Sequence, residues 1–146
     1  LLIGVYIAAS FVNFIPSIKY PDYELNVIQL IMSSVFLIVL LIFVKKRHSK
    51  VMKAILLIGI FSSLYVFFIN QIESQFMIHF ILEGIASLQY PLYLIFVTPM
   101  FGINYLLKLD YGILALIVTI FYLSILLLSL SPYQKGDAPQ YRRGNL

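Results

Sequence analysis

Residues 75–104, QFMIHFILEGIASLQYPLYLIFVTPMFGIN, are the stretch that decides how this chain is folded. The stretch is strongly apolar, yet it contains His79, Glu83 and two prolines. A helix over residues 76–107 would be about 48 Å long, well beyond the roughly 30 Å hydrocarbon core of a bilayer. The stretch must therefore divide, and the place where it divides sets the topology of the chain.

The composition explains why bilayer thickness is the relevant measure. The chain has 146 residues, of which 62% are hydrophobic and 11% are charged. Soluble domains have about a quarter of their residues charged, so this chain cannot build a polar shell in water. We expect an all-α integral membrane protein, with one helical domain over residues 1–131 and a polar tail over residues 132–146.

Five apolar runs predict five transmembrane helices in a small bundle. The first run is short and ends before Pro16, where a loop rich in proline and charge begins. In the third run, Gly59 and Ser63 have the spacing of small residues that lets two membrane helices approach closely. The predicted spans cover residues 1–15, 25–44, 54–72, 84–107 and 111–130.

The fourth predicted span contains both prolines of the opening stretch. Proline has no backbone N–H, so Pro91 frees the carbonyl of Ser87 and Pro99 frees that of Ile95. In a bilayer each freed carbonyl needs another partner. We expect a kinked helix at these positions, with the kink residues Ser87, Pro91, Thr98 and Pro99.

Residues before the fourth span have two possible placements. In the favoured one, residues 75–83 form a short interfacial helix, residues 84–107 cross the membrane, and the C-terminal tail lies outside. In the other, residues 76–89 dip into the membrane and residues 91–105 return to the same side, so the tail is cytoplasmic. A re-entrant segment is stable only when protein buries it or when it lines a wet cavity.

Gln75, His79 and Glu83 form a candidate site because their spacing of four places them on one helix face. An ionisable group inside a bilayer is costly and is a functional candidate. Histidine titrates near neutral pH, so this face is a candidate proton or ion site. At the membrane edge, the same residues are only a polar face that meets headgroups.

A basic cluster follows the second predicted span and predicts the orientation. Positive loops remain on the cytoplasmic side, or on the matrix or stromal side in an organelle. Such a cluster also attracts anionic lipid, and it is not read as a nucleic-acid site. Its members are Lys45, Lys46, Arg47, Lys50 and Lys53.

No pattern in the sequence predicts catalysis or a cofactor. Cysteine is absent, and the H-x-x-x-E pair supplies only two metal ligands where a catalytic zinc needs three. We expect an accessory or regulatory subunit of a larger membrane complex, which binds other subunits or a second copy of itself. The alternative is a small transporter or proton pathway. The abundance of Ile, Leu, Phe, Tyr and Lys suggests a low-GC genome, and hence a bacterial cytoplasmic membrane or an organellar inner membrane.

Overall fold

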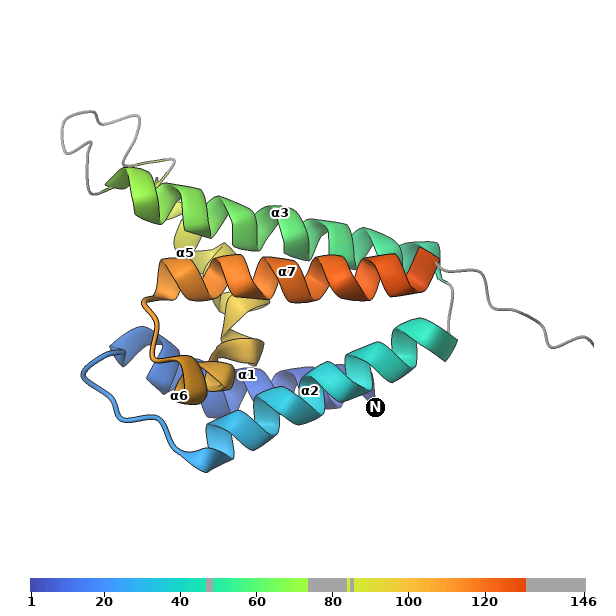
Figure 1. The fold of residues 1–146 in the computed structure, drawn as a ribbon, viewed down its shortest axis with the longest axis horizontal. Helices are drawn as coiled ribbons and strands as arrows, with labels where there is room; N and C mark the ends of the chain where they lie inside the picture. Colours follow the sequence, from blue (N-terminus) through green and yellow to red (C-terminus); the bar gives the residue numbers. More distant parts are fainter. Residues whose placement is uncertain (47–48, 74–83, 85, 131–146) are drawn as a thin grey trace, which may run out of the picture.

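The computed structural model describes residues 1–46, 49–73, 84 and 86–130 (Figure 1). The elements of this part are all helices, which confirms the predicted all-α class. Five of its helical segments are long and apolar enough to cross a membrane, so the chain is membrane-embedded by length and composition. These segments are Leu2–Lys19, Val27–Lys46, Lys50–Ile72, Gln89–Leu107 and Tyr111–Leu130.

Helix α1 (Leu2–Lys19) is longer than the sequence predicts, because it continues through Pro16. A proline removes only one helical hydrogen bond, here the one that would reach the Val12 carbonyl, so the turns on either side of it can stay helical. The Ser17 hydroxyl donates to the carbonyl of Phe14 at 2.9 Å. The Tyr20 N–H then closes the helix end on the Pro16 carbonyl at 3.0 Å.

Helices α2 (Val27–Lys46) and α3 (Lys50–Glu73) extend into the predicted basic loop. Lys45 and Lys46 form the last turn of α2, where positive charge favours the helix dipole. Lys50 and Lys53 lie in the first turn of α3. The connection is therefore shorter than predicted, although these four lysines remain together at one end of the molecule. Arg47 lies outside the described residues.

Helices α3 and α7 (Tyr111–Leu130) pack against each other in opposite directions. Near the middle of the pair, the hydroxyls of Ser63 and Thr119 are 2.8 Å apart. A Cβ at Gly59 would lie 3.2 Å from the Tyr122 ring, and one at Gly112 would overlap the Asn70 side chain. Residues with higher numbers in α3 contact residues with lower numbers in α7. The two helices are therefore antiparallel.

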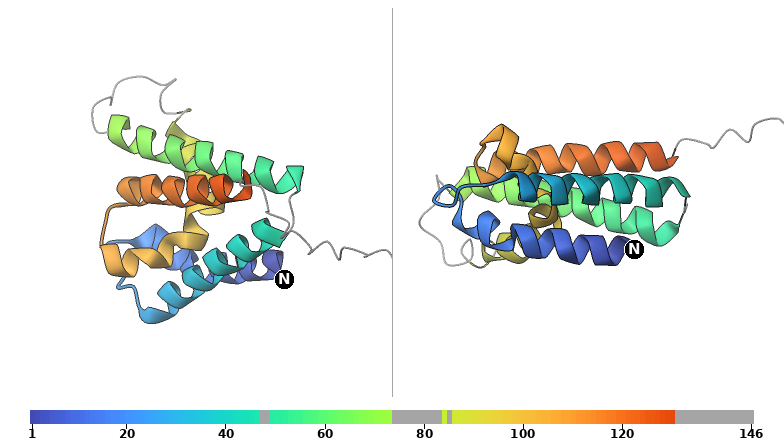
Figure 2. Two further views of the ribbon diagram at one scale, coloured as in Figure 1. Left: turned by 45° about the vertical axis from the view of Figure 1, so that its right-hand side comes forward. Right: turned by 90° about the horizontal axis from the view of Figure 1, so that it is seen from below.

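The fourth hydrophobic segment is made of four short elements and lies between two helix pairs. Figure 1 shows α3 and α7 on one side of it and α1 and α2 on the other. Its two ends, α5 (Gln89–Leu92) and α6 (Asn104–Leu107), both lie toward the end of the molecule where α3 stops and α7 begins (Figures 1 and 2). The elements are α5 (Gln89–Leu92), the π-helix η1 (Tyr93–Val97), the 3-10 helix η2 (Thr98–Ile103) and α6 (Asn104–Leu107).

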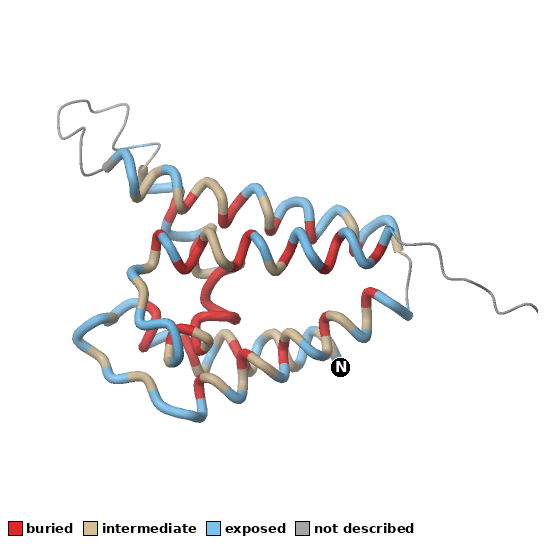
Figure 3. Tube along the Cα trace, viewed as in Figure 1, coloured by how far each residue is buried: buried red, intermediate tan, exposed pale blue. Residues whose placement is uncertain are grey.

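The middle of this segment is the most continuously buried part of the fold. Figure 3 shows the buried stretch where the segment passes between the helix pairs. Val97, Met100 and Phe101 are each 0% exposed. In contrast, many large apolar side chains on the outer faces of α1, α2, α3 and α7 are exposed, as expected for helices that face lipid.

The turn into α7 is held by two polar side chains. Asn104 donates to the Leu109 carbonyl and accepts from the Leu109 N–H, both at 2.8 Å. Asp110 then caps α7, because its carboxylate accepts from the N–H groups of Gly112 at 2.7 Å and Ile113 at 3.1 Å. Lys108, between them, has the left-handed φ of 51°.

Candidate functional site

The candidate site is the polar core around the broken fourth segment. Within Tyr93–Ile103 the backbone follows π and then 3-10 geometry, so the regular α-helical pairing of N–H and carbonyl groups is lost. Each unpaired backbone group in an apolar interior costs several kcal/mol in lipid, as an order of magnitude. Side chains from three other helices meet these groups.

The carbonyl of Ile95 has the partner that the sequence required. Pro99 cannot donate to it, and the Tyr6 hydroxyl of α1 donates instead at 2.9 Å. The next carbonyl, of Phe96, accepts from the Tyr122 hydroxyl of α7, also at 2.9 Å. Two tyrosines on opposite sides of the segment thus hold consecutive carbonyls.

Ser33 of α2 is the centre of a second group of hydrogen bonds. Its hydroxyl accepts from the Gly102 N–H at 3.0 Å and donates to the Pro99 carbonyl at 3.0 Å. The Asn13 amide of α1 donates to the same hydroxyl at 3.1 Å and to the Ala9 carbonyl at 2.8 Å. Asn13 and Ser33 are both 0% exposed, so these bonds are made without competition from water.

The Ser33 contacts require the backbone of η2 to lie close to the backbone of α2. A Cβ at Gly102 would overlap the carbonyl of Gln29 and the hydroxyl of Ser33. Glycine therefore allows η2 to approach the α2 backbone directly, in the same way that small residues allow membrane helices to approach each other.

A third group of hydrogen bonds joins the segment to the end of α1. The Tyr93 hydroxyl donates to the Ser17 carbonyl at 3.1 Å, and the Thr98 hydroxyl donates to the Ser17 hydroxyl at 3.2 Å. Tyr93 also packs edge-on against Phe101 and Tyr111, with ring centroids 6.4 and 5.9 Å apart. The segment is consequently tied to α1, α2 and α7 along most of its buried length.

The polar core contains neutral donors and acceptors. In the described ranges, no three His, Cys, Asp or Glu side chains come together as a group that could hold a metal. The described Asp, Glu and Lys residues lie in loops or in the end turns of helices. The contacts described in this core are hydrogen bonds of hydroxyl and amide side chains with backbone groups and with one another.

A cavity of about 370 Å³ adjoins this core on the side of α3 and α5. Tyrosine rings and aliphatic side chains form most of its wall. The lining residues are Ser17, Ile18, Tyr20, Val66, Gln89, Tyr90, Tyr93, Leu94 and Tyr111.

Comparison with known proteins finds no matching family model, curated protein or solved structure.

The predicted kink residues are only partly in the core. Thr98 is buried and bonded, and Pro99 is fully buried with its carbonyl bonded to Ser33. Ser87 is exposed, and its hydroxyl donates to the Gly84 carbonyl at 2.7 Å. Pro91 is exposed within α5.

The predicted polar face lies outside the described residues, since Gln75, His79 and Glu83 all fall between residues 74 and 83. It stays a prediction.

Sequence reasoning missed most residues of the polar core. Asn13, Tyr6 and Tyr122 are three of them, and Ser17, Ser33, Tyr93 and Gly102 are others. A signal for Asn13 was present, because it is a lone amide within an apolar run of α1. A polar side chain at that depth needs a partner inside the protein. The tyrosines carried no such signal, because tyrosine is also common at membrane interfaces.

Proposed function

We propose that this chain is a non-catalytic accessory subunit of a larger membrane complex. The observation that carries the proposal is that side chains of the polar core hydrogen-bond the backbone of the fourth segment. Tyr6, Ser33 and Tyr122 bond backbone groups of the fourth segment, which is the pattern of a rigid structural element. The outer faces of the long helices offer broad apolar surface to lipid and to neighbouring subunits.

In the proposed topology, the helices α1, α2, α3 and α7 cross the membrane. The fourth hydrophobic segment is re-entrant, so it enters and leaves the membrane on the same side. The antiparallel α3–α7 pair supports this topology, because Glu73 at the end of α3 and Tyr111 at the start of α7 then lie at the same membrane face. Burial between the helix pairs and bonded carbonyls meet the requirement for re-entrant backbone. This topology replaces the favoured five-span prediction and puts the C-terminal tail on the cytoplasmic side with Lys45 and Lys50.

The proline kink is part of the same proposal. Pro99 is the second residue of the 3-10 element η2, and the π-helix η1 directly before that element has the hydrogen bonding expected when a helix is interrupted. Pro91 lies earlier, in α5. We assign the main break to Pro99 and a smaller one to Pro91.

The proposal favours a structural role of this segment over ion transport. In transporters with broken helices, freed carbonyls coordinate the ion. Here the Ile95 and Pro99 carbonyls are already hydrogen-bonded to Tyr6 and Ser33. A transport role would therefore depend on the His79 and Glu83 face.

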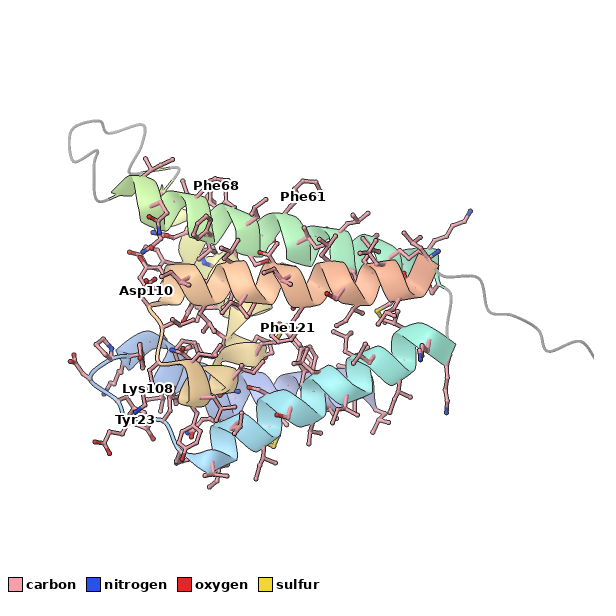
Figure 4. The ribbon with its side chains drawn as sticks, viewed as in Figure 1. Tyr23, Phe61, Phe68, Lys108, Asp110 and Phe121 are labelled. Atoms are coloured by element: carbon pink, nitrogen blue, oxygen red, sulfur yellow. The ribbon has the colours of Figure 1, made fainter. Side chains whose placement is uncertain are left out.

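Site-specific photocrosslinking in the native membrane tests the subunit proposal. The exposed side chains of Phe61 and Phe68 point away from α7 on the outer side of α3 (Figure 4). Phe11 samples the outer face of α1 and Leu127 that of α7. A photoreactive phenylalanine analogue at each position should give, on at least one face, an adduct with a different protein. The same variants kept in the dark are the control.

Two outcomes would contradict the proposal. If every face gave adducts with lipid alone, the chain would have no protein partner. If the protein adducts all had twice the mass of the chain, the complex would be a homo-oligomer. Proteoliposomes supply a third comparison, in which the variants His79→Ala and Glu83→Gln should leave proton flux at the level of the wild type. A drop in flux in both variants would support the transport alternative.

A further inference from the structure

A second cavity lies at the end of the molecule where the loop after α1 meets the turn before α7. Its volume is about 290 Å³, near the lower end of the range for small-molecule sites. Figure 4 shows Tyr23 and Lys108 together at this end of the molecule, with Asp110 nearby. The lining residues are Tyr20, Pro21, Tyr23, Glu24, Leu25, Asn104, Tyr105 and Lys108.

Both walls of this cavity are held by contacts elsewhere in the fold. On one wall, Asn104 fixes the turn through two bonds to Leu109, and the Lys108 N–H donates to the Asn104 carbonyl at 2.9 Å. On the other wall, the Tyr20 ring packs edge-on against the buried Phe101, at a centroid distance of 5.7 Å. A preorganised site of this kind loses little entropy when a ligand binds.

The charges of the cavity are opposite and separate. Glu24 contributes a carboxylate and Lys108 an ammonium, and both residues are exposed. No ion pair joins Glu24 to Lys108 in the described part of the chain. A ligand that carries both a positive and a negative group would therefore complement the cavity better than a simple anion or cation.

The aromatic residues specify the positive end of that ligand further. Tyr20, Tyr23 and Tyr105 line the cavity beside Glu24. Tyrosine rings attract ammonium groups through their π faces, and tyrosine side chains are typical of the depth at which headgroups lie. Lys108 offers a point charge for a phosphate.

We propose that this cavity binds the phosphoethanolamine headgroup of a membrane phospholipid. The phosphate lies against Lys108, and the primary ammonium lies against Glu24 among the three tyrosine rings. A phosphatidylglycerol headgroup has no cation, so Glu24 repels it. A phosphatidylcholine headgroup has a cation without N–H donors for the carboxylate. The site is at the opposite end of the molecule from the basic cluster, and it does not depend on the subunit role.

Native mass spectrometry of the detergent-purified full chain tests this assignment. The probes are the dihexanoyl forms of phosphatidylethanolamine, phosphatidylglycerol and phosphatidylcholine, together with free phosphoethanolamine. We expect one molecule of the ethanolamine lipid to bind at least about tenfold more tightly than the glycerol lipid. The affinity for the choline lipid should lie between the affinities for the other two lipids. Free phosphoethanolamine should bind more weakly than the ethanolamine lipid.

Two variants of the cavity locate the bound lipid. Lys108→Asn removes the ammonium and suits the left-handed backbone at that position, and it should weaken binding of both the ethanolamine and glycerol lipids. Glu24→Gln should weaken binding of the ethanolamine lipid about tenfold. The difference in affinity between the ethanolamine and glycerol lipids should therefore become smaller. Asp22→Asn in the same loop and Lys53→Asn at the other end lie outside the cavity and should change neither affinity.

The proposal fails if wild-type protein binds the ethanolamine and glycerol lipids equally. It also fails if Glu24→Gln, with an unchanged melting temperature, retains the wild-type preference. If free phosphoethanolamine binds as tightly as the ethanolamine lipid, the ligand of the cavity is not specifically a phospholipid, and the proposal fails in that respect.

Discussion

The Tyr6 hydroxyl in α1 donates a 2.9 Å hydrogen bond to the Ile95 carbonyl, four residues before Pro99. In a regular α-helix, residue 99 would supply this donor from its backbone. Tyr6 therefore replaces the N–H that proline lacks. The contact joins residues 89 positions apart, and it couples the first helix to the break in the fourth segment.

Tyr6→Phe should lower the free energy of unfolding by about 1 kcal/mol, because the Ile95 carbonyl loses its donor. In a Pro99→Ala background the loss should be smaller by at least about 0.5 kcal/mol, since alanine restores a backbone donor. Unfolding of the four proteins in detergent measures this coupling. Strictly additive effects would show that Tyr6 does not act on the carbonyl freed by Pro99.

Ser33→Ala should destabilise the chain by about 2 kcal/mol or more. The substitution leaves the Gly102 N–H and the Pro99 carbonyl without their hydroxyl partner in a buried site. Ser34→Ala is the matched control, because the Ser34 hydroxyl bonds only its own helix, at the Leu30 carbonyl. Thermal unfolding measures the difference in stability between the two variants. Equal melting temperatures would show that the Ser33 hydrogen bonds do not stabilise the core more than the Ser34 bond does.

Gly102→Ala should be the more severe of two glycine substitutions. Its Cβ would overlap the Gln29 backbone, which can move only if η2 separates from α2, so a loss of about 3 kcal/mol or more is expected. Gly4→Ala is the control, since a Cβ there meets nothing within 4 Å and alanine favours helix by about 1 kcal/mol. A folded, wild-type-like Gly102→Ala protein would contradict the close approach of η2 and α2.

Single cysteines test the proposed topology directly, because the chain has no cysteine of its own. In intact cells, an impermeant thiol reagent should label Asp22→Cys in the outer loop. It should label Gly136→Cys in the tail only after permeabilisation, as for Ser49→Cys beside the basic cluster. Labelling of Gly136→Cys in intact cells would instead return the fourth segment to a complete span.

The sequence by itself determined the solvent and most of the helices. A chain with so little charge can be stable only in a bilayer, and apolar run length then locates helices, as the agreement over Tyr111–Leu130 shows. It also identified the carbonyl of Ile95 as a group that needs a partner, because the absence of an N–H in proline is a local covalent fact. The end of α1 was misplaced, because one proline does not stop a helix whose next turn is bonded by Ser17 and Tyr20.

Only the tertiary structure decided the partners of the fourth segment and the direction in which its neighbours run. Residues 84–107 are long enough for a span and, once broken, short enough to turn back, so hydropathy is the same for both paths. The contact of the Ser63 hydroxyl with the Thr119 hydroxyl joins residues 56 positions apart, and the hydrogen bond from the Gly102 N–H to the Ser33 hydroxyl joins residues 69 positions apart. Such pairings arise from the mutual packing of helices, which local apolar patterns do not encode.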